Sequence, residues 1–242
     1  MAREHIILGK WSESELDTII RRGSQIDNTG KHIDFLSKHF LHTHYRESTL
    51  IGDSMTEEVL VINLEGVDCF TFIDYMEAMR LSDSFHVFKE NLIHVRYRNG
   101  IVSFETRNHF FTDWCEFNRK FVSDVTEDIG MHRTASEKKI LNKKKDGTPF
   151  LPGIEPRERQ INYIPTRKID SFIMEKLKSG DYVGIYTPQD GLDVSHVGII
   201  IRQGNSLYLR HASSLSDYRK VIDQNFLKYI HDKSGIIVVR PR

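Results

Sequence analysis

The chain has 242 residues, 39% of them hydrophobic, which is enough to bury a sizeable core in one large domain. Lys plus Arg equals Asp plus Glu at 34 each, so the formal net charge is zero and the composition argues against a nucleic-acid partner. No run approaches the about 18 apolar residues of a membrane span, and residues 1–10 lack the cationic and apolar regions of a signal peptide.

The first predicted elements are two helices. Ser12 and Glu15 have the spacing of a capping box, which predicts a helix from there to about Arg22. Residues 31–45 repeat apolar side chains at helical spacing and predict a second helix. We expect both helices to lie on the surface of a larger body.

A strand and a third helix follow. Residues 58–64 are rich in β-branched side chains, which predicts a short extended segment that ends at the next glycine. A helical pattern then runs from Cys69 to about residue 81, so this cysteine falls at a helix N-terminus. Asn99-Gly100 is the strongest hairpin signal in the chain and predicts a β-hairpin at that point.

The middle of the chain, residues 107–170, mixes aromatic, charged and Pro-containing stretches. Its segment DGTPFLPG (146–153) is predicted to be a loop because it is rich in turn residues. We expect this middle part to be an insertion that shapes a substrate site.

The last part of the chain predicts an antiparallel sheet of consecutive strands. Turn residues at Gly191 and Gly204-Asn205 separate three β-rich runs, and a short helix (224–231) and the strand GIIVVR (235–240) follow them. The three runs are DYVGIY (181–186), VSHVGIII (194–201) and SLYLRHAS (206–213). Together with the earlier helices, these strands predict an α+β fold.

No internal repeat, low-complexity tract or linker divides the sequence, so we expect a single domain over residues 1–242. The expected parts of this domain are a helical N-terminal part (1–57), the cysteine-bearing helix with the hairpin (58–106), the insertion (107–170) and the sheet that carries two histidines (171–242).

Cys69 is a candidate nucleophile because of its position. The thiolate is the reactive form of cysteine, and a helix N-terminus favours the ionised thiol and offers backbone N–H groups to an oxyanion. On its own, VDCFTF (67–72) fits a buried structural cysteine equally well. The second cysteine, Cys115, could in principle pair with Cys69, but one bridge in a domain of this size is not a disulfide scaffold.

Two histidines complete a possible catalytic set. His196 lies at the beginning of a predicted strand, and His211 follows the next strand after a two-residue turn, so strand pairing brings the two side by side. A catalytic base is itself oriented by a third group. We therefore expect His196 to be the base and His211 the orienting residue, with two structural histidines bonded to backbone carbonyls as the alternative.

Three segments resemble the signatures of NlpC-type papain-like cell-wall cysteine hydrolases. These are DCFTF (68–72), SHVGI (195–199) and RHAS (210–213), and GDYVGIY (180–186) resembles the strand that precedes the base in that superfamily. The resemblance implies a papain-like core, in which the nucleophile helix packs on an antiparallel sheet, with extra N-terminal helices and a middle insertion. It implies Cys69 as nucleophile, His196 as base and His211 as the orienting residue.

The context of these signatures is similar to the N-acetylmuramoyl-L-alanine amidase-like branch. EGVDCFTF (65–72) and TRNHFFTDW (106–114) carry this resemblance, and Phe70-Thr71 stand where common endopeptidases have a small residue and glycine. The branch is implied to hydrolyse the amide between the muramic-acid lactyl group and L-alanine. The alternatives are a γ-D-glutamyl-diaminopimelate endopeptidase of the same superfamily and a catalytically silent peptidoglycan-binding module.

Six further residues are candidates for binding the substrate. Aromatic faces and guanidinium groups suit sugars and carboxylates, and the aspartate before the cysteine could orient an amine or stabilise its turn. An ordinary aromatic core segment is the alternative for residues 107–114. The candidates are Asp68, Arg107, His109, Asp113, Trp114 and Ser195.

Metal binding is the weaker interpretation of the 12 histidines. His39, His42 and His44 are close in sequence, but no HExxH or paired CxxC motif is present, and a solvated helix surface explains them. We therefore expect no metal and no other cofactor. The expected partner is peptidoglycan or a muropeptide in the periplasm or cell envelope, and nothing in the sequence fixes an oligomeric state.

Overall fold

The computed structural model describes residues 3–242, which fold into helices packed around two β-sheets. The α-helices are α1 (Glu13–Ser24), α2 (Thr29–Lys38), α3 (Cys69–Arg80), α4 (Phe85–Arg96), α5 (Phe111–Phe117), α6 (Thr126–Gly130), α7 (Ser171–Lys176) and α8 (Phe226–Ile230). The strands are β1 (Glu4–Ile7), β2 (His44–Tyr45), β3 (Leu60–Asn63), β4 (Gly66–Val67), β5 (Val122–Asp124), β6 (Ala135–Leu141), β7 (Arg157–Pro165), β8 (Tyr182–Tyr186), β9 (Val194–Gln203), β10 (Ser206–Ser213), β11 (Lys220–Asn225) and β12 (Gly235–Pro241). The 3₁₀ turns are η1 (Arg98–Gly100), η2 (Met131–Arg133) and η3 (Thr166–Lys168).

The large sheet determines the layout of the molecule. Its strands are ordered β4-β2-β11-β10-β9-β8-β12-β7-β6, and β5 pairs with β12. The pairs from β2 to β6 along this order are antiparallel, but β2 and β4 run parallel. The sheet is therefore mixed, whereas the sequence predicted an antiparallel one, because the short strand that leads into α3 joins its edge. A separate parallel pair, β1–β3, was not predicted, since its two strands are far apart in the sequence.

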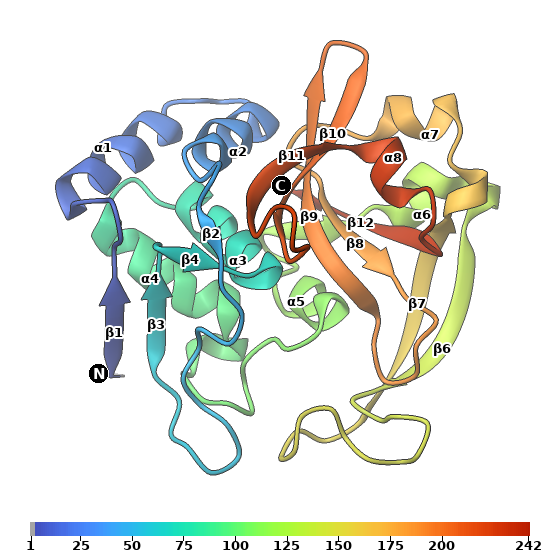
Figure 1. Ribbon diagram of the computed structural model, residues 1–242, viewed down its shortest axis with the longest axis horizontal. Helices are drawn as coiled ribbons and strands as arrows, with labels where there is room; N and C mark the ends of the chain where they lie inside the picture. Colours follow the sequence, from blue (N-terminus) through green and yellow to red (C-terminus); the bar gives the residue numbers. More distant parts are fainter. Residues whose placement is uncertain (1–2) are drawn as a thin grey trace.

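Helices cover both faces of the large sheet, and each face has its own hydrophobic core. Figure 1 shows α1–α4 on one side of the central strands and α6–α8 on the other. Alternate residues of β9 enter the two cores: Val197 and Ile199 pack with α1–α5, whereas Ile200 packs with α6–α8. A strand buried on both faces has a continuous apolar run, which is why the sequence identified it as core.

Several elements lie where local signals predicted them. Ser12 and Glu15 form a capping box at the start of α1, and α3 begins at Cys69. The strands β8, β9 and β10 match the three β-rich runs, and Gly204, with φ of 57°, lies in the turn between β9 and β10. The segment 146–153 contains turns and bends, as expected.

The hairpin predicted at Asn99-Gly100 does not form. Both residues have the positive φ of a turn, 56° and 68°, but the segment before them is helix α4 and the segment after them is irregular. Packing of the apolar face of α4 outweighs the local turn signal. The apolar residues that this helix buries are Phe85, Phe88, Leu92 and Val95.

Two predicted helices are shorter than expected. The helix predicted over residues 31–45 ends at Lys38, because turns and the strand β2 follow it. The helix predicted over 224–231 begins only at Phe226, because Gln224 belongs to strand β11. The middle part of the chain contributes β5, β6 and β7 to the large sheet.

A buried carboxylate fixes α3 against the sheet. Glu77 has no exposed surface, and its carboxylate accepts hydrogen bonds from the Tyr182 hydroxyl of β8 at 2.9 Å and from the Arg80 guanidinium at 2.9 Å. Arg80 also donates to the backbone carbonyl of Arg242 at 3.2 Å. These bonds tie the helix that carries Cys69 to β8, the neighbour of β9, and to the C-terminus.

We expect Glu77→Ala to lower the free energy of unfolding by about 3 to 5 kcal/mol, because it leaves the buried guanidinium of Arg80 without its counter-ion. Glu65→Ala is the matched control, since the Arg46–Glu65 pair is about half exposed and its loss should cost under about 1 kcal/mol. Urea denaturation of both variants measures the difference. Equal effects of the two substitutions would refute this role of Glu77.

Candidate active site

The N-terminus of α3 places Cys69 at the first position of the helix. Asp68 is the N-cap: its carboxylate accepts hydrogen bonds from the backbone N–H groups of Phe70 at 3.0 Å and Thr71 at 2.7 Å. The Thr71 hydroxyl oxygen accepts a hydrogen bond from the Asp68 N–H at 3.0 Å, which closes a capping box. Asp68 therefore has a structural function, which the sequence left open beside substrate binding.

The sulfur of Cys69 lies against β9. The backbone N–H of Val197, the residue after His196, is close enough to the sulfur to act on it and lowers the pKa of the thiol. Burial, followed by the charge of Asp68, raises the pKa of the Cys69 thiol to about 12, although backbone N–H groups act in the opposite direction. The resting thiol is thus protonated at neutral pH, whereas the position at a helix N-terminus predicted an ionised one.

His196 and His211 lie side by side on β9 and β10, as the hairpin between these strands predicted. Nε2 of His196 and Nδ1 of His211 are 2.8 Å apart, and the two rings are nearly perpendicular at 89°. Nε2 of His211 lies 3.3 Å from Oε1 of Gln224 on β11. The three side chains thus form one line across three neighbouring strands.

The hydrogen-bond partners determine which ring nitrogen carries the proton in His196 and in His211. Burial lowers the pKa of His196 to about 3, together with the charge of His211, and burial lowers the pKa of His211 to about 4, so both rings are neutral at pH 7. The Gln224 carbonyl oxygen only accepts, so His211 carries its proton on Nε2 and accepts at Nδ1 from His196 Nε2–H. Nδ1 of His196 is left with a free lone pair.

Tyr229 on α8 connects the histidines with the cysteine. Its ring centroid lies 6.0 Å from that of His196 and 4.9 Å from that of His211. Burial, and after it the charge that Cys69 can carry, raises the pKa of Tyr229. The rings of His196, His211 and Tyr229 therefore form one aromatic cluster.

A cavity of about 760 Å³ begins at the same helix end. It is lined by Asp68, Arg107 and His109 from the predicted binding residues, and by Phe70 and other residues of α3. The Arg107 guanidinium donates to Glu58 at 2.9 Å, and Nε2 of His109 bonds with the backbone carbonyl oxygen of Phe104 at 2.7 Å. The structure thus brings three of the six predicted binding residues to a cavity beside Cys69.

The other three predicted binding residues lie elsewhere. Trp114 has 0% exposed surface, and its indole N–H donates to Asp74 at 3.0 Å, so we assign it to the core and not to a sugar platform. Asp113 forms ion pairs with Arg157 and Arg159 on β7. Ser195 is exposed next to His196, and its hydroxyl donates to a backbone carbonyl of β8 at 3.4 Å.

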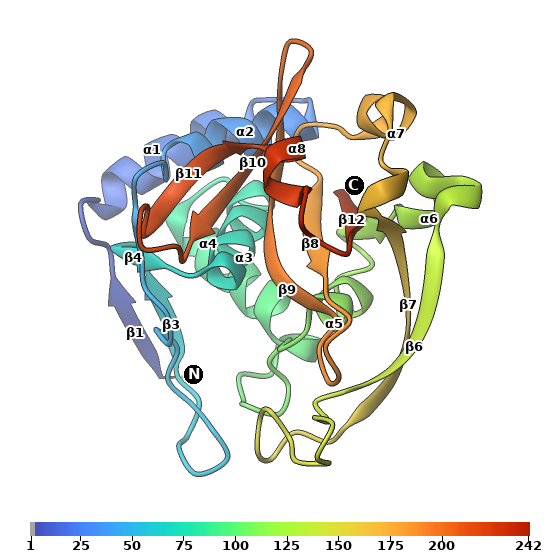
Figure 2. The same cartoon turned by 45° about the vertical axis from the view of Figure 1, so that its right-hand side comes forward.

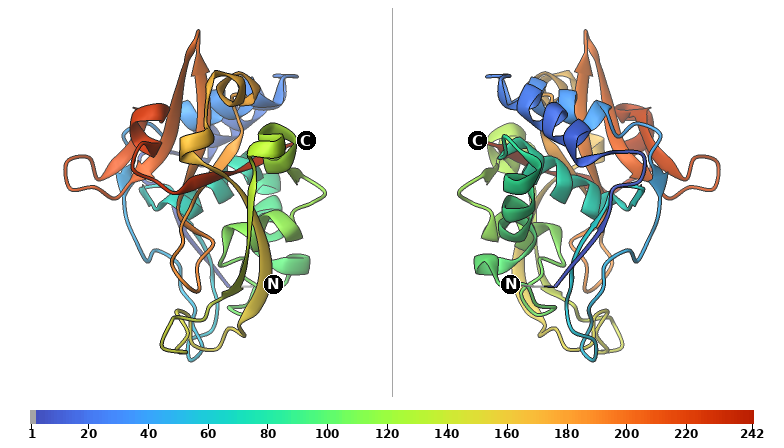
Figure 3. Two further views of the ribbon diagram at one scale, coloured as in Figure 1. Left: turned by 90° about the vertical axis from the view of Figure 1, so that its right-hand side faces the viewer. Right: turned by 90° about the vertical axis from the view of Figure 1, so that its left-hand side faces the viewer.

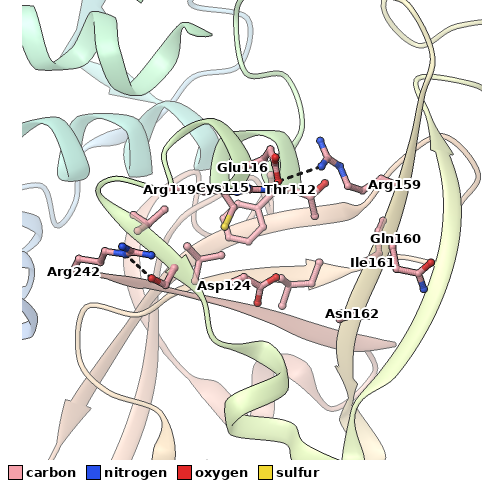
Figure 4. A pocket seen from close by; sticks show the side chains of 15 residues that line it. Thr112, Cys115, Glu116, Arg119, Asp124, Arg159, Gln160, Ile161, Asn162 and Arg242 are labelled. Atoms are coloured by element: carbon pink, nitrogen blue, oxygen red, sulfur yellow. Dashed lines mark hydrogen bonds and ion pairs between the residues drawn. The ribbon is translucent and has the colours of Figure 1, made fainter. Parts of the chain in front are cut away.

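The second cysteine lies in a different environment. Cys115 lines a separate cavity of about 320 Å³ between α5, β5, β7 and β12, where Glu116 and Arg159 form an ion pair (Figure 4). Burial and the charge of Asp124 raise the pKa of Cys115 to about 12. None of the residues that line this cavity is a histidine, so Cys115 has no imidazole base there.

Sequence reasoning missed Gln224 and Tyr229. Both residues fall within the segment 224–231, which the sequence predicted as a helix, and this prediction hid the strand β11. KVIDQN (220–225) has no regular alternation of apolar and polar residues, so the sequence carried no clear signal for this strand. Its pairing with β10 places Gln224 diagonally opposite His211.

Residues 3–242 contain neither a cluster of metal-ligating side chains nor a helix that could span a membrane. Within residues 3–242, no group of three or more His, Cys, Asp or Glu side chains is placed to hold a metal ion. In the same part of the chain, every helix is too short or too polar to cross a bilayer. His42 and His44 are exposed, and His39 packs edge-on against Phe35 at 5.0 Å.

Comparison with known proteins identifies a family and a shared fold. A family model described as AmiA-like, N-acetylmuramoyl-L-alanine amidase-like, matches residues 35–236. A Legionella pneumophila protein of the DUF1460 family has a TM-score of 0.79 at 24% identity and covers 95% of this chain and 94% of its own. Two structures of a Bacteroides uniformis N-acetylmuramoyl-L-alanine amidase are 28% identical, cover 88% of this chain and 99% of their own, and have TM-scores of 0.71 and 0.73. None of the curated proteins compared with the chain matches it.

We expect His211 to make the protein less stable in acid. An unfolded imidazole titrates near pH 6.5, whereas burial lowers the pKa of folded His211 to about 4, so the unfolded state binds the extra proton between these values. Stability should fall by about 1 to 2 kcal/mol between pH 7 and pH 5 from this group alone. Denaturant titrations at both pH values test this, with a smaller loss expected in His211→Asn.

His132→Asn is the control, because its side chain is exposed. Its loss of stability between the two pH values should equal that of the wild type. An unchanged loss in His211→Asn would contradict the assignment of a buried neutral imidazole.

Proposed function

The chain belongs to the AmiA-like, N-acetylmuramoyl-L-alanine amidase-like family, and from this premise we propose that it is a cysteine-dependent peptidoglycan amidase. The proposed reaction is hydrolysis of the amide between the lactyl group of N-acetylmuramic acid and L-alanine in muropeptides. One observation carries the proposal: the Cys69 sulfur lies against the strand of His196, whose ring bonds with His211. These three residues are the proposed nucleophile, base and orienting residue.

The neutral resting state defines the proposed first step. Nδ1 of His196 removes the thiol proton while the Cys69 sulfur attacks the lactyl carbonyl carbon, because neither group is charged beforehand. The tetrahedral intermediate collapses as the imidazolium protonates the alanine nitrogen, and the C–N bond breaks. Water then attacks the thioester with His196 as base, which releases the carboxylic acid and restores the thiol.

His211 and Gln224 support this step through the imidazolium. When His196 accepts the proton, its Nε2–H bond to His211 Nδ1 becomes charge-assisted and stronger. His211 in turn is oriented by Gln224. Because His211 and Gln224 carry no negative charge, they do not make the His196 imidazolium a weaker acid. The imidazolium therefore gives its proton readily to the leaving amine.

The helix end leaves one backbone donor for the oxyanion. The sequence suggested several N–H groups, but those of Phe70 and Thr71 already donate to Asp68. The Cys69 N–H lies near its own sulfur and lowers the pKa of the thiol, and within residues 3–242 it bonds no backbone carbonyl outside the helix. We assign this group as the donor that faces the developing oxyanion.

The papain-like, NlpC-type placement and the cellular site are parts of the same proposal. A cysteine at the start of a helix that packs on β9, followed by histidines on two antiparallel strands, supports this placement. The peptidoglycan substrate of the proposed reaction places the protein in the periplasm or cell envelope.

Cys69→Ala should lower the rate of muropeptide hydrolysis at least about a thousandfold and leave the fold intact, because no other group supplies the nucleophile. Cys115→Ala is the matched control and should retain the activity. Mass spectrometry of the wild-type products should show sugar and peptide as separate species. Cleavage within the stem peptide would instead indicate an endopeptidase, and persistent activity in Cys69→Ala would refute the mechanism.

His196→Ala should lower kcat more than His211→Ala, by at least about a hundredfold against about tenfold, because only His196 transfers the proton. Initial rates on one muropeptide measure both effects. His86→Ala, at an exposed site, should change nothing. If His211→Ala proved the more damaging variant, the assigned roles of base and orienting residue would be wrong.

A further inference from the structure

The loop 214–219, between β10 and β11, lies next to the start of α3. It follows the strand that carries His211, and Figure 2 shows it beside β2, β4 and the first turn of α3. In both views of Figure 3, this loop projects from the body of the molecule. Tyr45 of β2 pairs with Val67 of β4, and Cys69 is the second residue after Val67. The short strands β2 and β4 therefore link the loop to the helix that carries the proposed nucleophile.

Backbone hydrogen bonds hold Arg219, the last residue of this loop, against β2. Its N–H donates to the carbonyl of Leu215 at 2.9 Å, and its own carbonyl oxygen accepts from the N–H of Tyr45 at 2.9 Å. Its φ of 45° lies in the left-handed region, which non-glycine residues seldom occupy. Such an outlier persists only where the surrounding structure fixes it, so the backbone of Arg219 has a defined position.

The Arg219 side chain is exposed and available to a ligand. Its guanidinium carbon lies 4.7 Å from the centroid of the Tyr45 ring, so the ring supports the planar group without using its N–H donors. Within residues 3–242, this guanidinium forms no ion pair and donates no hydrogen bond. Its edge presents parallel N–H groups, which is the geometry that the two oxygens of a carboxylate accept.

The cavity next to Cys69 has the opposite charge. Its lining contains more carboxylates than guanidinium groups, so it repels an anionic part of a ligand. The carboxylates are Asp53, Asp68 and Asp74, and the guanidinium groups are Arg96 and Arg107. Arg219 and the adjacent Lys220, which also has no ion pair within residues 3–242, attract such a part. The start of α3 thus has an acidic cavity and a basic edge beside it.

We propose that Arg219, stacked on Tyr45, binds a carboxylate of the stem peptide, an inference that rests on the proposed function. In a muropeptide, the amide that is cut joins a neutral sugar to an acidic peptide. The second stem residue, D-glutamate, has a free α-carboxylate because the stem continues through its γ-carboxyl. Of the two surfaces beside Cys69, only the basic edge is complementary to this group. The neutral sugar then faces the acidic cavity.

The dimensions of the stem agree with this orientation. Neighbouring strands are about 4.8 Å apart and two residues span at most about 7 Å, so the Cα atoms of Tyr45 and Cys69 lie within roughly 12 Å of each other. The L-alanine and D-glutamate of the stem also span about 7 Å when extended. The α-carboxylate therefore comes within reach of the guanidinium over the Tyr45 ring when the lactyl carbonyl lies at the sulfur.

Arg219→Gln tests the proposal with two probes that differ in one carboxylate. The substitution is made in the Cys69→Ala protein, and calorimetry measures binding of N-acetylmuramoyl-L-alanyl-D-glutamate and of its α-amide, N-acetylmuramoyl-L-alanyl-D-isoglutamine. We expect about three- to tenfold weaker binding of the acid and an unchanged affinity for the amide, because only the acid offers the charged partner. Arg219→Lys should retain part of the preference for the acid, since it keeps the charge without the planar fork.

Arg22→Gln is the matched control, because Arg22 is also exposed and lies over an aromatic ring, that of Phe35 at 5.8 Å, but belongs to α1. It should leave both affinities unchanged. Equal weakening of both probes by Arg219→Gln would indicate a structural role and overturn the proposal, as would an unchanged affinity for the acid or no binding of either probe. Hydrolysis by the wild type is measured separately, so its absence would remove the proposed function without deciding the binding result.

Discussion

The contact between the start of α3 and strand β9 is the constraint on which the site depends. Asp68 ends the extended segment before the helix and fixes Cys69 as its first residue, while the N–H of Val197 lies close to the sulfur and lowers its pKa. Neither the helix nor the strand fixes this geometry alone. A helix end can fray, and a strand does not by itself determine which helix packs on it. Glu77, bonded to Tyr182, prevents the helix from shifting along the sheet.

Burial at this contact decides the chemistry as well as the geometry. It raises the pKa of Cys69 and lowers the pKa of His196, so the low-polarity site disfavours both charged forms. A helix dipole amounts to about half a charge, which is too little to offset the desolvation of a thiolate. In the proposed mechanism, the thiol therefore keeps its proton until a substrate carbonyl is present, and charge develops only during attack, beside the N–H assigned to the oxyanion.

The sequence predicted those parts of the structure that local interactions determine. A capping pattern located α1, and a helical pattern after a glycine located α3. A glycine turn between two apolar runs located the β9–β10 hairpin and hence the pair His196 and His211. The sequence failed where contacts between distant segments determine the structure. Asn99-Gly100 has turn dihedrals, but no hairpin forms because the helix before it packs its apolar face into the core. Gln224 was missed for the same reason, because β11 is defined by its pairing with β10.

In the proposed function, recognition and catalysis share one structural element. The first turns of α3 carry the proposed nucleophile on one side and Phe70, Thr71 and Asp74 of the neighbouring cavity on another. Asp74 of this helix also holds the guanidinium of Arg96 in the wall of the cavity. In the proposed function, a substrate group held in this cavity therefore lies at a distance from the attacked carbonyl that a rigid helix sets, and such fixed spacing selects one scissile bond among the chemically similar amides of a muropeptide.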